Sequence, residues 1–211
     1  MTDKPAFAAL RTLQEGNARF VAGQATQGTV RAGAWRDFVA GQHPFAVVLG
    51  CSDSRVPVEM VFDQGLGDLF VIRVAGNVAA PSPMGSIEFA VAHLGVPLVV
   101  VLGHTHCGAV RMTLDVMQNK TQDDLSPAVR SIVDRVRPAV ESTIPVGGHP
   151  SSAGVDEAIC ANVRASVRDI QHGLSDWGPT GATGHVMVVG ALYELESGRV
   201  RFLDGRQGHL I

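Results

Sequence analysis

Two short polar clusters contain the residue types that bind a transition metal. They read CSDSR at residues 51–55 and GHTHCG at residues 103–108. Cysteine sulfur and histidine nitrogen are ligands that zinc takes readily, and a catalytic zinc site keeps three protein ligands and one open position. Cys51, Cys107 and one histidine would supply these three ligands, which predicts a zinc site.

His104 is favoured over His106 as the third ligand. The two residues between His104 and Cys107 allow one turn to present both side chains to the same ion, as in a C-x₂-C half-site. His106 is adjacent to Cys107 and is therefore expected to point away from the metal.

Asp53 has two possible roles beside such an ion. As a fourth ligand it would close the site, and as a neighbouring acceptor it would orient a water molecule on the metal. Arg55 can hold Asp53 ionised through a bidentate ion pair. Because two thiolates neutralise the charge of zinc, a water on this metal needs such an acceptor to ionise near neutral pH.

Simpler interpretations remain for the three cysteines of the chain. Cys51 and Cys107 could be buried apolar thiols, since free cysteine is often buried. Cys160 is predicted to fill the core, because it lies next to Ile159 in a stripe of apolar residues with helical spacing. Three cysteines do not form a disulfide framework.

Each polar cluster follows or ends an apolar run that is typical of a buried strand. These runs lie at residues 45–49 and 98–102. Further strands are predicted at residues 69–75, 185–195 and 200–203, the last one antiparallel. The order of strands and helices predicts an α/β fold, with a mainly parallel central β-sheet, one antiparallel edge strand and flanking helices. Both clusters would then lie at the carboxyl edge of the sheet, where such folds bind ligands.

The remaining helices are predicted from the spacing of apolar residues and from residues that can cap a helix. Residues 6–22 form an amphipathic helix with no evident partner in its own domain, so residues 1–35 are expected to be an N-terminal helical arm that packs on a partner subunit. A helix over 87–94 is predicted to start at Ser86 as N-cap. No linker divides the chain, which predicts a single zinc-dependent catalytic domain over 1–211.

Composition narrows the class of partner. The formal net charge of −3 disfavours nucleic acid and anionic membranes, which select basic surfaces. No apolar run reaches the roughly 20 residues of a membrane span. The first residues lack the basic and apolar pattern of a signal peptide, so a cytoplasmic location is expected.

With the clusters at residues 51–55 and 103–108 in this order and at this spacing, the sequence resembles the β-class carbonic anhydrases. The matching segments lie at residues 51–57, 85–91 and 103–108. The resemblance implies one Zn²⁺ per chain on Cys51, His104 and Cys107, with Asp53 and Arg55 as a catalytic dyad beside the metal. It also implies a homodimer or a homotetramer built as a dimer of dimers.

The resemblance further implies a substrate pocket for carbon dioxide and bicarbonate. Gln42 matches a glutamine that hydrogen-bonds bound substrate or product. Phe70, Ala75 and Phe89 match positions of the apolar wall, and the backbone N–H of Gly108 is a further polar contact.

One departure concerns an inhibitory bicarbonate site that some family members have. Val48 occupies the position of its tryptophan, although Arg73 matches its arginine. We therefore expect Asp53 to stay off the metal at neutral pH. A low-pH form with Asp53 as fourth ligand remains open.

The predicted function is zinc-dependent reversible hydration of carbon dioxide to bicarbonate and a proton, by attack of zinc-bound hydroxide. This makes the chain a carbonic anhydrase, a lyase. Two alternatives are a related zinc hydrolase of carbonyl sulfide or carbon disulfide, and a non-catalytic module in which Asp53 closes the zinc site.

Overall fold

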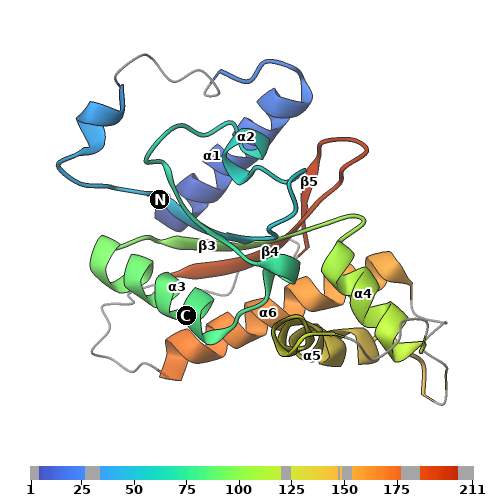
Figure 1. Cartoon of the computed structure of the whole chain (residues 1–211). Helices are drawn as coiled ribbons and strands as arrows, with labels where there is room; N and C mark the ends of the chain where they lie inside the picture. The colour runs from blue at the N-terminus through green and yellow to red at the C-terminus, as the bar shows by residue number, and fades with distance from the viewer. Residues whose placement is uncertain are drawn as a thin grey trace.

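The protein is built on a five-stranded sheet in the order β2-β1-β3-β4-β5 (Figure 1). The computed structural model describes residues 5–26, 34–119, 125–146, 148, 154–176 and 186–203. The strands are β1 (Ala46–Gly50), β2 (Leu69–Arg73), β3 (Leu98–His104), β4 (Met187–Tyr193) and β5 (Val200–Phe202). β5 pairs antiparallel with β4, while the other pairs are parallel, which confirms the predicted sheet.

Helices cover both faces of the sheet. One face carries α1 (Pro5–Val21) and α2 (Val58–Val61). The opposite face carries α3 (Pro81–Leu94) and α6 (Val155–Asp176), with α4 (Gly108–Met117) and α5 (Pro127–Glu141) packed beside α6 (Figure 1). Successive strand residues point to opposite faces, so Val48 packs in the cluster that includes α1 and Val47 in the cluster that includes α6. This burial explains the unbroken apolar runs.

The order of the strands creates a switch point between β1 and β3. From β1 the chain passes through α2 to β2 on one side, and from β2 it passes through α3 to β3 on the other side of β1. The carboxyl ends of β1 and β3 are therefore neighbours, with Gly50 aligned to Leu102. Open α/β sheets bind ligands at such a point.

Several predicted boundaries are wrong, among them that of the second strand, which is predicted over 69–75 and ends at Arg73 as β2. α3 begins at Pro81, so Ser86 lies inside the helix and its hydroxyl donates to the Ser82 carbonyl at 3.0 Å. A proline in the first turn removes no helical hydrogen bond, which permits this early start. β3 also continues past residue 102 and ends at His104.

The N-terminal helix is not a detached arm in this structure. Ala6, Ala9 and Leu13 of α1 are buried in the core cluster on the α2 face of their own chain. Packing of this helix on a partner subunit stays a prediction for its exposed side. Residues 1–4 and 27–33 of the expected arm lie outside the described residues.

The side chain of Asn17 connects α1 by hydrogen bonds to α2 and to the turn that leads into β5. Its amide nitrogen donates to the carbonyls of Val61 at 3.0 Å and Gly198 at 2.9 Å. Its amide oxygen accepts from the backbone N–H of Val200 at 2.8 Å. The side chain is buried, so these bonds replace water that cannot reach it.

Among the described residues, no helix combines the length and the apolar character needed to cross a membrane.

Replacing Asn17 by alanine should destabilise the fold. The Asn17→Ala variant removes the partner of the buried Val61 carbonyl and of two part-buried backbone groups, at Gly198 and Val200, which should lower the free energy of unfolding by about 2 to 3 kcal/mol. Urea unfolding at fixed protein concentration measures this. Gln14→Ala, on the exposed side of the same helix, is the control and should change it by less than about 0.5 kcal/mol. Equal effects of both substitutions would contradict the role of Asn17.

Candidate metal centre

The side chains of Cys51, His104 and Cys107 converge at the switch point of the sheet. Cys51 directly follows β1, His104 is the last residue of β3, and Cys107 directly precedes α4. Their potential ligand atoms all lie within 4.8 Å of one another, and all three residues are buried. These are the three residues that the sequence predicts as ligands.

The histidine of this cluster is oriented for metal binding. Its Nδ1 lies 2.9 Å from the carbonyl oxygen of Thr105, which accepts when the proton is on Nδ1. Within the described part of the chain, the buried Nε2 has no hydrogen-bond partner. A buried unpaired polar atom costs about 1 to 3 kcal/mol. A metal ion on the Nε2 lone pair would satisfy it, so His104 fits the role of ligand.

The two thiols also fit a metal ion. A hydrogen bond from Cys107 lowers the pKa of Cys51. The bond to the Cys51 sulfur, burial and the negative charge on Cys51 raise the pKa of Cys107. Without a cation, only one of the two thiols ionises readily, whereas a divalent ion stabilises both thiolates. Two thiolates and one imidazole are a donor set that zinc prefers.

Asp53 lies beside the cluster and is held by Arg55. The guanidinium donates from Nε to Oδ1 at 2.9 Å and from Nη2 to Oδ2 at 2.8 Å, and the backbone N–H of Arg55 donates to Oδ1 at 3.0 Å. The side-chain bonds from Arg55 hold the pKa of Asp53 well below its usual range. Oδ2 of Asp53 lies 3.8 Å from Nε2 of His104. An ionised carboxylate therefore borders the metal ligands.

Arg73 at the end of β2 holds the loop that contains Cys51 and Asp53. Its Nε donates to the Cys51 carbonyl at 3.0 Å, and its Nη2 donates to the Asp53 carbonyl at 2.6 Å. The sequence indicates Arg73 only through the arginine of an inhibitory site. This supporting role joins residues that are far apart in the chain, so no local pattern predicts it.

Two of the predicted pocket residues lie at the metal centre. Gly108 directly follows Cys107 and begins α4. Ala75 begins the short 3₁₀ turn η2 (Ala75–Asn77), in which the N–H of Gly76 donates to the Cys51 sulfur at 3.4 Å.

The other predicted pocket residues lie elsewhere in the chain. Phe70 pairs with Val47, four residues before Cys51, which corresponds to roughly 13 Å along the strands. Phe89 on α3 packs near Phe70 with ring centroids 6.3 Å apart, and it is 47% exposed. Gln42 is exposed and precedes β1. The structure therefore does not bring these three side chains to the metal ligands of the same chain.

His106 lies outside the ligand cluster. Its Nε2 hydrogen-bonds the carboxylate of Glu196, which also accepts from the Thr105 hydroxyl at 3.1 Å. The backbone carbonyl of His106 accepts from Arg55 at 3.3 Å. Glu196 thus fixes the turn between His104 and Cys107, and the sequence analysis missed this residue.

Cys160 is half-buried against the core cluster around Cys107 and is not among the ligands.

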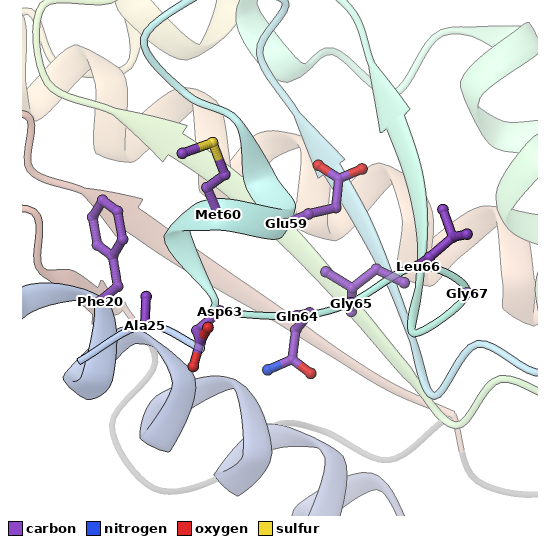
Figure 2. Close-up of a pocket in the computed structure, with 10 residues that line it drawn as sticks. Phe20, Ala25, Glu59, Met60, Asp63, Gln64, Gly65, Leu66 and Gly67 are labelled. Atoms are coloured by element: carbon purple, nitrogen blue, oxygen red, sulfur yellow. The ribbon is translucent and has the colours of Figure 1, made fainter. Parts of the chain in front are cut away.

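A separate cavity of about 400 Å³ lies between the end of α1, α2 and the loop before β2 (Figure 2). Its walls include Phe20, Met60 and Leu66, and Asp63 lies on the side of α1. None of the metal-centre residues lines this cavity, so the chemistry of the cysteine and histidine cluster does not involve it.

Comparisons with known proteins agree with this site. The carbonic anhydrase family model matches residues 46–200. Carbonic anhydrase 2 of Mycobacterium tuberculosis is 41% identical over 197 residues, which cover 93% of this chain and 92% of that protein. The carbonic anhydrase of Mycolicibacterium smegmatis is 43% identical over 203 residues, covering 95% and 94%.

A solved structure extends the similarity to the fold. The β-carbonic anhydrase CcaA has a TM-score of 0.68 to this structure at 26% sequence identity, over 97% of this chain and 92% of that one. The matched region includes the whole metal centre, whose two cysteines and one histidine are zinc ligands in type and arrangement. The chain belongs to the β-carbonic anhydrase family.

Proposed function

We propose that this chain is a zinc-dependent carbonic anhydrase, which reversibly hydrates carbon dioxide to bicarbonate and a proton. The observation that carries this proposal is the buried Cys51, His104 and Cys107 cluster with the carboxylate of Asp53 beside it. When bound, zinc supplies the Lewis acidity that makes water a nucleophile near neutral pH.

Asp53 acts as the acceptor that orients the reacting water. Because Arg55 keeps this carboxylate ionised, Asp53 can accept a hydrogen bond from the water without taking up its proton in the neutral range. The bond directs an oxygen lone pair toward the carbon of the substrate. Asp53 and Arg55 thus form the catalytic pair.

The geometry favours an open site over a closed zinc module. Both oxygens of Asp53 already accept hydrogen bonds from Arg55. As a fourth zinc ligand, Asp53 would have to weaken or give up part of this bidentate pair. The ion pair therefore supports Asp53 as a neighbour of the metal, which leaves one coordination position for the reaction.

The substrate pocket is shared between two copies of the chain. Gly108 and Ala75 contribute from the chain that holds the metal, whereas Gln42, Phe70 and Phe89 contribute from the partner. Two observations support this arrangement: β2 is an edge strand, and Phe89 is almost half exposed in the single chain. The assembly is a homodimer, or a dimer of dimers.

The location that suits this chemistry is the cytoplasm. The three cysteines are free thiols. A reducing compartment preserves such thiols for metal binding.

Metal content and substrate turnover test the function directly. The purified protein should contain one zinc per chain and should accelerate carbon dioxide hydration in a stopped-flow assay. Removal of zinc with a chelator should abolish this activity, and added zinc should restore it. Cys107→Ser should lose the metal, whereas Cys160→Ser, at a cysteine outside the cluster, should keep both metal and activity. A folded wild-type protein without metal would contradict the proposal.

The same assay separates the alternative substrates. Faster turnover of carbonyl sulfide or carbon disulfide than of carbon dioxide would favour the related hydrolase, and zinc binding without any turnover would favour the closed module.

Loss of the catalytic pair should reduce the rate and leave the metal in place. Asp53→Asn should lower kcat/KM by about 100-fold or more, because a reacting group that is no longer held in the right orientation reacts far more slowly. Zinc content, measured on the same preparation, should stay at one per chain. Asp115→Asn is the matched control, because it removes the carboxylate of the Arg111–Asp115 surface pair on α4. Normal activity of Asp53→Asn would remove Asp53 from the mechanism.

Complementation tests the shared pocket. Cys107→Ser lacks a metal site but keeps Gln42 and Phe89, and a Gln42→Ala/Phe89→Ala double variant has the opposite defect. Random mixing of the two inactive chains makes about half of the dimers mixed, each with one complete site, so activity should return to about a quarter of the wild-type value. Mixtures that stay inactive, although mixed dimers form, would place the pocket within one chain.

A further inference from the structure

The turn that donates to the Cys51 sulfur has an unusual backbone. Gly76 has φ 72° and Asn77 has φ 46°, so two consecutive residues lie in the left-handed region. Glycine adopts this region freely, but asparagine does so at some cost in free energy. Such a conformation persists when surrounding contacts enforce it.

Two polar side chains of α6 donate hydrogen bonds to the backbone of this turn. Nδ2 of Asn162 donates to the Gly76 carbonyl at 2.8 Å, and the Ser166 hydroxyl donates to the Asn77 carbonyl at 3.0 Å. Both side chains are buried. They are four residues apart and so lie on one face of the helix. Each of the two left-handed residues is therefore held through its carbonyl oxygen.

The position of α6 is set by two glycines of the sheet. A Cβ atom on Gly103 would lie 2.4 Å from a methyl carbon of Val163, and one on Gly190 would lie 2.9 Å from the other methyl carbon. Helix α6 can pack this close only because both strands lack a side chain there. Gly103 directly precedes the ligand His104, so the contact of Val163 with Gly103 fixes α6 next to this end of β3. The neighbouring Asn162 is thereby placed beside the turn at Gly76.

We infer that Asn162 and Ser166 are positioning residues of the metal centre, which act through the Gly76 turn on the sulfur of Cys51. This inference rests on the proposed function of the cluster as a zinc site. A backbone N–H aimed at a thiolate fixes the position of the sulfur and withdraws charge from it, and such outer contacts tune the metal. If Asn162 is lost, the buried Gly76 carbonyl loses this donor, the turn relaxes, and the N–H no longer points at the sulfur.

Two substitutions on α6 test this inference. Asn162→Leu keeps approximate size and removes the donor, and the cavity of about 230 Å³ that Asn162 and Ser166 border leaves room for the new side chain. Zinc affinity, measured by competition with a chelator, should fall about 10- to 100-fold, as is typical when an outer contact of a ligand is removed. Ser166→Ala should reduce it less, by about threefold. In the cobalt-loaded protein, the thiolate-to-cobalt absorption band should shift in both variants.

Val167→Ala is the matched control, because Val167 packs in the core on the same helix. It should lower the midpoint of thermal unfolding but leave zinc affinity and the cobalt band at wild-type values. Equal changes in Asn162→Leu and Val167→Ala would assign the effect to general helix packing and overturn the inference. If Asn162→Leu fails to fold, an unchanged band and affinity in Ser166→Ala would overturn it as well. Failure of the wild-type protein to bind zinc would instead overturn the proposed function.

Discussion

The structure depends on bringing two thiols and one imidazole together as almost fully buried side chains at the carboxyl edge of the sheet. Cys51, His104 and Cys107 are each at most 4% exposed. The negative charge on Cys51 raises the pKa of Cys107, so a cation favours the form in which both thiols are ionised. Metal binding to such a buried cluster contributes directly to folding. Zinc is thus part of what stabilises the carboxyl edge of the sheet, in addition to its role in the reaction.

Backbone groups from separate elements fix these ligands in place. The carbonyl of Thr105 orients the His104 ring, and the N–H of Gly76 points at the Cys51 sulfur. Arg73 binds the backbone on both sides of Ser52. The loop after β1 is therefore supported by the end of β2 and by η2. A preset ligand geometry of this kind reduces the reorganisation that metal binding requires.

The sequence predicts the chemistry of this centre well because its signals are local. The spacings of Cys51 to Arg55 and of His104 to Cys107 lie within single turns, and both follow apolar runs that mark buried strands. Contacts between distant segments carry no such signal. Asn162 looks like an ordinary polar residue of an amphipathic helix, and its bond to Gly76 is visible only once α6 is packed on the sheet. The start of α3 is hard to predict for a different reason, because proline indicates a loop as readily as a first helical turn.

The family resemblance assigns Gln42 and Phe70 to the substrate pocket, but both lie far from the metal ligands of their own chain. The direction of the strands explains this difference. In a parallel sheet every carboxyl end lies at one edge, so residues near the amino ends of β1 and β2 cannot approach Cys51 of the same chain. Gln42 and Phe70 are residues of this kind. A pocket that uses them requires a second chain that brings its amino edge to the first chain's metal. For the pocket proposed above, assembly becomes a condition for catalysis, because each chain alone would hold the metal ligands but only part of that pocket.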